Sequence, residues 1–282
     1  MKVRIIIDST VDLCPDIKSR MMVVPLTVHF GEEEYVDGVT ITHENFYEKL
    51  IESDVLPSTS QATPASFSKA FEDVVNSGES AVVLTVSSNL SGTYQSAVIA
   101  SQEYPEKIYV VDTKTVSICS GILAEMALNL SDNGMSAKQI ADHITKEREN
   151  VCVIAMLDTL EYLKKGGRIS KTAAFAGGIL SIKPVISIKD GEILVLGKAR
   201  GSKQGNNLLV REIESSGGVD FTKPVMLGYT GLSDELLKKY VKDSEALWKS
   251  DINVLKSTMI GSVIGTHAGP GAIAVAFFKN KR

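Results

Sequence analysis

The first half of the sequence is dominated by short, continuous apolar runs that alternate with segments of helical periodicity. The runs at residues 3–7, 82–86 and 108–111 lack alternating polar positions, which is typical of strands buried on both faces. Between and after them, apolar residues recur every three to four positions in residues 63–75, 119–130 and 136–144. Strand–helix alternation of this kind predicts a mainly parallel sheet flanked by helices.

Two of the predicted helices have clear start signals. Thr63 and Pro64 are typical of an N-cap residue followed by proline at the first helical position. Ser136 and Gln139 have the spacing of a capping box, in which each side chain bonds to the other residue's backbone N–H. These signals fix the starts of helices near residues 64 and 137.

The pattern changes after the strand-like run at residues 151–157. Two apolar runs are joined by Lys189-Asp190-Gly191, and Asp-Gly between such runs predicts a hairpin. We further expect helices at 207–215 and 234–248, a strand at 225–229, and a closing pair of strands at 254–264 and 271–278. The sequence therefore predicts an α/β fold with two domains: an α/β domain over residues 1–150 and an α+β domain with a mixed or antiparallel sheet over residues 151–282.

Charge and composition exclude several classes of partner. The net charge of −4 gives no basic surface for nucleic acid or for strong binding to an anionic membrane. No apolar run reaches membrane-spanning length, so we expect at most peripheral membrane contact. The three cysteines are widely spaced, as expected for free thiols in a reducing compartment, and the first residues lack a signal-peptide pattern. A cytoplasmic location is the resulting expectation.

Hydroxyl-rich loops follow each of the three strands in the first half. They are Asp8-Ser9-Thr10, residues 87–93 and residues 112–115, and a fourth polar stretch at residues 58–61 precedes a helix. Ligands of open α/β sheets bind beyond the carboxyl ends of the strands, where helix N-termini favour an anion. Any single loop of this kind is more often a helix cap than a ligand site, but residues 87–93 hold more hydroxyls than one cap requires. The group predicts a site for an anionic head group.

Other chemistry has weak support. The glycine pairs at 166–167 and 177–178 match neither a P-loop nor a dinucleotide fingerprint, and no spaced set of metal ligands exists. We expect no metal and no cofactor. Ser91, His267 and Asp8 supply the residue types of a hydrolase triad, but Ser91 lacks the G-x-S-x-G context. A stand-alone serine hydrolase using Ser91 and His267 is therefore kept as an alternative.

His267 differs from the other histidines in its surroundings. It lies in residues 265–271, a segment rich in Gly and Pro that we expect to form a sharp loop between two apolar strands. Backbone geometry rather than a packed face would then place its imidazole. We expect His267 to contact the ligand.

Six motifs in chain order resemble the DegV family. They are Asp8-Ser9-Thr10, Thr59-Ser60-Gln61, Leu90-Ser91-Gly92-Thr93-Tyr94, Val111-Asp112-Thr113, Lys165-Gly166-Gly167-Arg168-Ile169-Ser170 and Thr266-His267-Ala268-Gly269-Pro270-Gly271. Together they cover nearly the whole chain. One departure is that the proline often found directly after Ser-Gln stands two places later, at Pro64.

The resemblance implies a two-domain fatty-acid-binding protein without turnover of its own. Such proteins present a long-chain fatty acid to a separate ATP-dependent fatty acid kinase, which converts the carboxyl group to acyl-phosphate. By resemblance, Thr59, Ser91 and His267 contact the carboxylate between the domains. The other ligand-binding residues expected are Ser60, Gly92, Thr93 and Phe175, whereas the loops at residues 8–10 and 112–113 become scaffolding.

The resemblance also implies roles for two arginines and for an acyl tunnel. Arg168 and Arg200 match basic positions suited to docking the kinase or steadying the phosphate. The small apolar run at residues 173–180, which includes Phe175, has the composition to line a tunnel, and close helix packing explains it equally well. A purely regulatory protein that senses lipid through the same pocket stays open as a second alternative.

Overall fold

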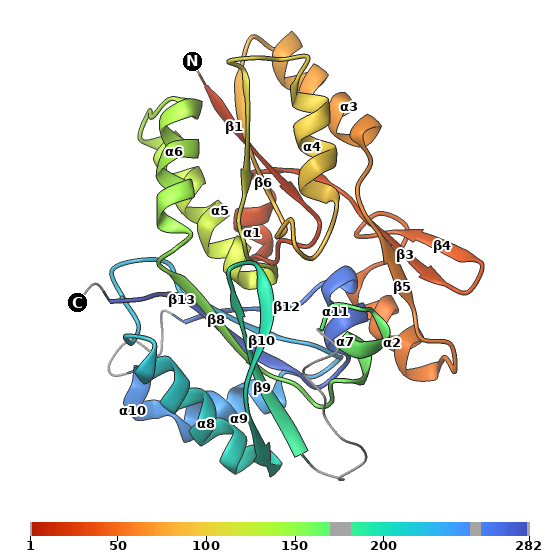
Figure 1. Cartoon of the computed structure of the whole chain (residues 1–282), viewed down its shortest axis with the longest axis vertical. Helices are drawn as coiled ribbons and strands as arrows, with labels where there is room; N and C mark the ends of the chain where they lie inside the picture. Colours follow the sequence, from red (N-terminus) through yellow and green to blue (C-terminus); the bar gives the residue numbers. More distant parts are fainter. Residues whose placement is uncertain (1, 170–181, 249–254, 281–282) are drawn as a thin grey trace.

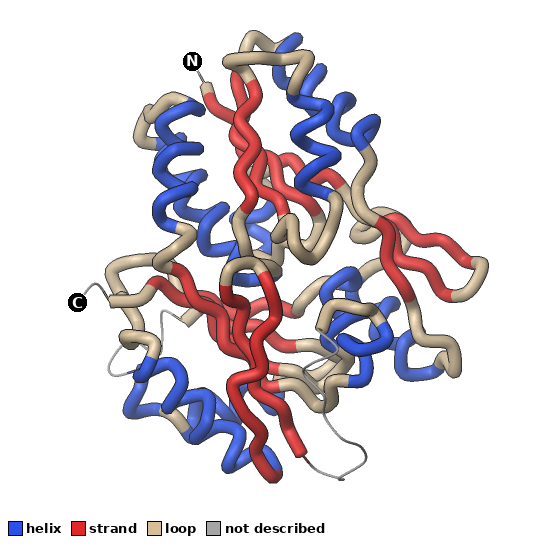
Figure 2. The backbone as a smooth tube through the Cα atoms, in the orientation of Figure 1, coloured by secondary structure: helices blue, strands red, loops and turns tan. Residues whose placement is uncertain are grey.

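The computed structural model describes residues 2–169, 182–248 and 255–280. In this part of the chain two sheets are stacked with helices between them and on their outer faces (Figure 1). The upper sheet and its helices come from the first half of the sequence, and the lower sheet comes from the second half (Figure 2). The expected α/β architecture, with a parallel sheet in the N-terminal part and a mixed sheet in the C-terminal part, is confirmed.

The first sheet is parallel throughout. Its order is β2 (Met22–Val24), β1 (Val3–Asp8), β6 (Ser80–Thr85) and β7 (Ile108–Asp112). The strands β1, β6 and β7 coincide with the three apolar runs, and every residue of β6 is buried. Helices α3 (Pro64–Asn76) and α4 (Thr93–Ser101) pack on one face, and α5 (Ser117–Asp132) and α6 (Ala137–Glu147) on the other. A short helix, α1 (Pro15–Lys18), follows β1.

The predicted helix starts are present. The Thr63 hydroxyl accepts a hydrogen bond from the Ser66 N–H at 3.2 Å, and both bonds of the capping box between Ser136 and Gln139 are formed. Helix α5 contacts strands of both sheets, which explains why ten of its residues are buried. A helix that is apolar on nearly all sides belongs in the interior, and α5 joins the two halves of the core.

The second sheet is mixed and has the order β10-β9-β8-β13-β11-β12. The strands are β8 (Val151–Met156), β9 (Ile182–Lys189), β10 (Glu192–Arg200), β11 (Met226–Tyr229), β12 (Lys256–Met259) and β13 (Ile273–Phe278). The β9–β10 hairpin turns at Asp190-Gly191 as predicted. Helices α8 (Gly201–Ser215), α9 (Glu235–Asp243) and α10 (Glu245–Trp248) cover its outer face, and α9 and α10 divide the single helix expected at residues 234–248.

Strands do lie within the predicted ranges 254–264 and 271–278, as β12 and β13, but the prediction that they pair with each other is wrong. Strand β12 pairs with β11 in parallel, β13 lies between β8 and β11, and residues Ser262–Ala268 form helix α11. The buried Asp12 carboxylate accepts a 2.9 Å hydrogen bond from the N–H of Gly261, the N-cap residue of α11. A side-chain oxygen that accepts this N–H satisfies a donor at the start of the helix, and it comes from a residue about 250 positions away that no local pattern reveals.

A small three-stranded sheet was not anticipated. Strands β3 (Thr27–Phe30), β4 (Glu33–Val36) and β5 (Ser58–Ser60) pair antiparallel, with α2 (His43–Glu52) between β4 and β5 in sequence. Figure 1 shows this sheet beside α11, and β3, β5 and α2 all contact that helix. Residues 27–60 therefore reach from the first half of the chain to the second. No helix in the described ranges is long and apolar enough to cross a membrane.

Candidate functional site

A cavity of about 380 Å³ lies between the two sheets, next to α5 and α11. We call it the apolar cavity, because aliphatic side chains form most of its wall. These side chains include Leu26, Val86, Leu90, Val116, Ile118, Val153, Ala155, Leu157, Ile186, Ile188, Ile193, Ile260, Val263 and Ile264. Its size is in the range of about 300–1,000 Å³ that is usual for small-molecule sites.

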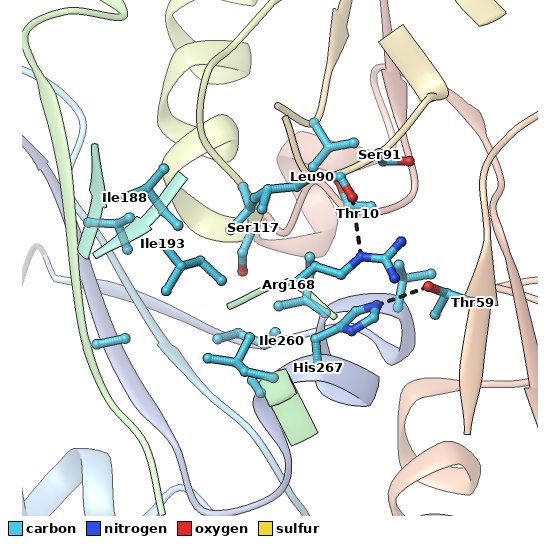
Figure 3. A pocket seen from close by; sticks show the side chains of 18 of the residues that line it. Thr10, Thr59, Leu90, Ser91, Ser117, Arg168, Ile188, Ile193, Ile260 and His267 are labelled. Atoms are coloured by element: carbon cyan, nitrogen blue, oxygen red, sulfur yellow. Dashed lines mark hydrogen bonds between the residues drawn. The ribbon is translucent and has the colours of Figure 1, made fainter. Parts of the chain in front are cut away.

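One end of the apolar cavity carries a group of polar side chains. Thr59, Ser91, Arg168 and His267 gather there, and we call these four residues the polar cluster (Figure 3). They come from β5, from the loop before α4, from the segment after α7 (Glu161–Lys165) and from α11. A wall that is apolar along its length and polar at one end fits an amphipathic ligand with a polar head.

His267 lies in the last turn of α11, not in the loop expected from the glycines around it. Its Nε2 lies 2.9 Å from the Thr59 hydroxyl, and its Nδ1 is buried without a hydrogen-bond partner among the described residues. Burial, together with the positive charge of Arg168, lowers the pKa of His267 from 6.5 to about 4. The imidazole is therefore neutral at pH 7 and has one N–H to donate.

Arg168 supplies the positive charge of the polar cluster. Its Nε donates to the Leu90 carbonyl at 3.3 Å and its Nη1 to the Gly166 carbonyl at 2.6 Å, as Figure 3 shows for Leu90. These bonds use two of the five N–H groups of a guanidinium and fix its plane. Its remaining N–H groups make no hydrogen bond within the described ranges and could donate to an anion in the cavity, where two parallel bonds to a carboxylate would be strong.

Ser91 is held in place by its neighbours at the start of α4. Its hydroxyl lies 2.9 Å from the Thr93 hydroxyl, and Thr93 itself is fully buried. Gly92 is the N-cap residue of α4, and the Gln61 side chain packs against its Cα and donates to the Ser96 hydroxyl at 3.0 Å. Ser91 thus faces the cavity at a helix N-terminus, where the backbone dipoles also favour an anion.

The hydroxyl loops separate into ligand-facing and structural parts. The buried Asp8 carboxylate accepts from the N–H and hydroxyl of Thr10 and from the Val86 N–H, which ties together the ends of β1 and β6. Ser87 donates to the Gly191 carbonyl at 2.8 Å and so anchors the β9–β10 hairpin. Thr10 does line the cavity. Asp8 and Ser87 are scaffolding.

The residues of the hydrolase alternative do not form a triad. The one hydrogen bond of the His267 imidazole with described residues is to Thr59, and its Nδ1 has no carboxylate partner. Asp8 is bonded to Thr10 and Val86 instead. Without an orienting acid and a contact to Ser91, the imidazole has no geometry for general-base activation of that serine. No group of three or more metal-ligating side chains occurs in the described ranges.

The structure brings most of the predicted site residues together. Thr59, Ser60, Ser91, Gly92, Arg168 and His267 all line the apolar cavity. Thr93 lies behind Ser91 and is absent from the cavity wall, and Arg200 is the N-cap residue of α8 at a distance from it. Phe175 and the run at residues 173–180 lie outside the described residues.

Sequence reasoning missed most of the apolar wall. Val153, Ala155, Ile186 and Ile188 come from β8 and β9, and Ile264 comes from α11. In the sequence these runs are indistinguishable from ordinary core, because a strand that faces a cavity needs the same aliphatic residues as one that faces a packed helix. The loop that holds Ser91 was detectable because its hydroxyls exceed what helix capping requires, whereas Thr59 and Arg168 were singled out by the family resemblance.

Comparison with known proteins identifies the family. The model of the family described as "uncharacterised protein, DegV family" matches residues 2–280. The chain belongs to the DegV family. A DegV domain-containing protein of Caldanaerobacter subterraneus is 34% identical over 285 residues, which is 99% of this chain and 99% of that protein.

Solved structures of DegV proteins share the fold over the whole chain. The DegV family protein of Thermus thermophilus, described by its fatty acid binding, superposes with a TM-score of 0.87 at 29% identity over 99% of this chain and 100% of that one. A stearic-acid-binding protein of Eubacterium ventriosum has a TM-score of 0.86 at 28% identity, with 98% of each chain covered. A fatty acid binding DegV protein of Streptococcus agalactiae has a TM-score of 0.85 at 27% identity, with both chains covered completely.

Proposed function

We propose that this protein binds a long-chain fatty acid and presents it to a separate ATP-dependent kinase that forms the acyl-phosphate. The observation that carries the proposal is the apolar cavity between the sheets with the polar cluster at one end. The fatty acid binding named for the DegV family protein of Thermus thermophilus, and the stearic acid named for the protein of Eubacterium ventriosum, support the same ligand class.

The tail supplies the affinity. Burial of a methylene group contributes about 0.8 kcal/mol, so a chain of about 16 carbons contributes on the order of 10 kcal/mol before ordering costs. The wall from β8, β9 and α11 is aliphatic, and its residue types do not indicate a preferred position for double bonds in the tail. Affinity for the tail is therefore a matter of length and shape.

The head group needs orientation and a satisfied charge. A buried carboxylate without partners is costly, and the polar cluster offers the hydroxyls of Thr59 and Ser91 and the free N–H groups of Arg168. When the His267 Nε2–H donates to Thr59, the Thr59 hydroxyl is free to donate its own hydrogen to the carboxylate. The carboxylate would lie at the N-terminus of α4.

Phosphoryl transfer would require a second protein. The sequence has no P-loop and no dinucleotide fingerprint, so the chain has no recognised means of holding ATP. In the proposed reaction, a carboxylate oxygen attacks the γ-phosphorus of ATP bound to the kinase, and ADP leaves. The kinase supplies the nucleotide site and the electrophile, and this chain supplies an oriented nucleophile.

Native and denaturing mass spectrometry of protein purified without detergent tests the ligand. We expect a stoichiometric fatty acid, and uptake of added fatty acid after its removal. Thr59→Val and Ser91→Ala should each weaken binding by roughly 5- to 50-fold, because each removes one head-group hydrogen bond. The exposed Ser77→Ala, on α3's C-terminal side, is the control. A protein that is empty and takes up no fatty acid would refute the proposal.

A further inference from the structure

A second cavity lies against the apolar cavity, at the side away from the polar cluster. Its volume is about 430 Å³, and its wall includes four cations: Lys114, Arg148, Lys189 and Lys279. We call it the basic cavity. It lies beneath the tip of the β9–β10 hairpin, which Figure 1 shows reaching up to the loops of the first sheet.

Only a few residues separate the two cavities. Val153 and Ile188 line both of them. Thr115 lines the basic cavity while the adjacent Val116 lines the apolar one. The partition thus includes Val153 and Ile188, whose side chains would have to move for the two cavities to connect.

The basic cavity has a surplus of positive charge. Its wall contains the carboxylates of Glu149 and Asp190 and four cations, one of which, Lys114, is paired with the Asp112 carboxylate behind the wall at 3.1 Å. Arg148 pairs with the Glu149 carboxylate at 3.4 Å, whereas Lys279 Nζ donates only to the neutral Glu149 carbonyl at 2.8 Å, which leaves its charge uncompensated. Such a wall attracts an anion.

A buried hydroxyl and a constrained loop add independent support. The Thr115 residue is 4% exposed, and its hydroxyl lies beside the Cys119 thiol, a weak hydrogen-bonding group, with no stronger partner among the described residues. The two residues that bracket Thr115 and Val116, Lys114 at φ 55° and Ser117 at φ 56°, adopt left-handed conformations. Strain of this kind persists where the surroundings over-determine the backbone, as they do in ligand clamps.

The hairpin tip is fixed over the basic cavity by the first half of the chain. Ser87 donates to the Gly191 carbonyl at 2.8 Å, and the Asn89 amide donates to the Asp190 carbonyl at 2.9 Å. These bonds place Lys189 at the rim. Its ammonium makes no hydrogen bond or ion pair within the described part of the chain, so it is available to a ligand.

We infer that the basic cavity binds a second carboxylate, at the ω-end of an acyl chain whose first carboxylate occupies the polar cluster. The inference rests on the proposed function and names a further substrate class, the long-chain α,ω-dicarboxylic acids. A chain that passes the partition leaves the aliphatic wall and meets Thr115 and the cations. A methyl end gains nothing there, whereas a carboxylate gains hydrogen bonds and charge compensation.

Binding of matched pairs of acids tests the inference. For each length between about 12 and 20 carbons, the dissociation constants of the monocarboxylic and the α,ω-dicarboxylic acid are measured by calorimetry on delipidated protein. We expect a length at which the dicarboxylic acid binds within about tenfold of its partner. If every dicarboxylic acid binds more than 100-fold more weakly than its partner, the second carboxylate has no site and the inference is overturned.

Variants locate the second carboxylate. Lys189→Gln and Thr115→Val should each weaken dicarboxylic acid binding roughly tenfold and leave monocarboxylic acid binding unchanged, whereas the exposed Lys138→Gln on α6 should change neither. Loss of both acids in Thr115→Val would reflect misfolding, and Lys189→Gln then decides. An unchanged ratio of the two dissociation constants in Lys189→Gln would overturn the inference.

A third arm separates the ω-carboxylate from a free anion. Succinate is added to protein loaded with a monocarboxylic acid. We expect no binding tighter than millimolar, since the cavity lacks the tail's contribution. The basic cavity would be a site for anions from solution if succinate bound with a micromolar dissociation constant, if Lys189→Gln abolished that binding, and if no long dicarboxylic acid bound. If monocarboxylic acids themselves did not bind, the proposed function would be contradicted. The experiments therefore distinguish failure of the proposed function from failure of the inference about the second carboxylate.

Discussion

A methyl group at position 166 should disable the polar cluster without removing any of its polar atoms. Gly166 has φ −70°, so alanine fits its backbone, and it follows α7, where alanine is the better helix former. However, a Cβ at this position would lie 2.8 Å from Cε1 of His267 and closer still to its Nδ1. Since carbon atoms pack at about 3.5–4.0 Å, the imidazole must retreat by about 1 Å.

This displacement of the imidazole changes the contact between His267 and Thr59. The His267 Nε2 and Thr59 Oγ1 atoms are 2.9 Å apart, so a displacement of the ring by about 1 Å either compresses this contact or breaks it. Loss of a buried hydrogen bond that leaves its partner unsatisfied costs about 1–3 kcal/mol. We therefore expect Gly166→Ala to weaken fatty acid binding roughly 5- to 150-fold, measured by calorimetry on delipidated protein.

A double-mutant cycle tests the route of the effect. In a Thr59→Val background the contact is already absent, so Gly166→Ala should cost much less there than in the native protein. The exposed Lys165→Ala on the same helix serves as a control for folding, together with the thermal unfolding midpoint. Binding of Gly166→Ala within twofold of the native protein, or full additivity of the two substitutions, would refute the reasoning.

Three further predictions concern buried titratable groups. The pKa of His267 is about 4 in the folded protein and 6.5 in the unfolded chain, so between these pH values only the unfolded chain takes up a proton. The free energy of unfolding of the ligand-free protein should therefore fall by about 2–3 kcal/mol from pH 7 to pH 4. Urea titrations of His267→Gln should lack this pH-dependent loss. Asp8→Asn should lose about 2–4 kcal/mol in urea unfolding at pH 7, because an amide NH₂ would face the donors now bonded to the carboxylate, and a loss below 1 kcal/mol would contradict this. Burial raises the pKa of Cys119 to about 12, so mass mapping should find this thiol unmodified by iodoacetamide at pH 8 until the protein is unfolded, and rapid labelling of the native protein would disprove it.

Elements of this fold were predictable from the sequence when residues within the element specify it, and were missed when the stabilising partner lies far away in the sequence. Strands β1, β6 and β7 were predictable because continuous apolar runs between helices are rare outside buried parallel sheets. Helix α11 was not, because its adjacent apolar residues imitate a strand and its N-terminal acceptor is Asp12. The small sheet was also missed, since β4 begins with exposed glutamates and the other two strands, β3 and β5, are four and three residues long.

The candidate site divides in the same way. The sequence placed hydroxyls at strand ends, and Ser91 and Thr59 do line the cavity. It had no means of separating them from Ser87, whose partner Gly191 is 104 positions away. Likewise, the position of Arg168 beside His267 depends on the packing of α7 against α11, which only the folded chain specifies.

The order of strands in the second sheet has a consequence during synthesis on the ribosome. Strand β13, at residues 273–278, lies between β8 and β11, and His267 immediately precedes it. Strand β8 ends at Met156, so at about 5–20 residues per second its edge waits roughly 6–24 s for this neighbour. Throughout that interval the edge of β8 that pairs with β13 has no partner from this chain. The last tenth of the chain to emerge pairs with this edge, closes the cavity and completes the contact between Thr59 and His267.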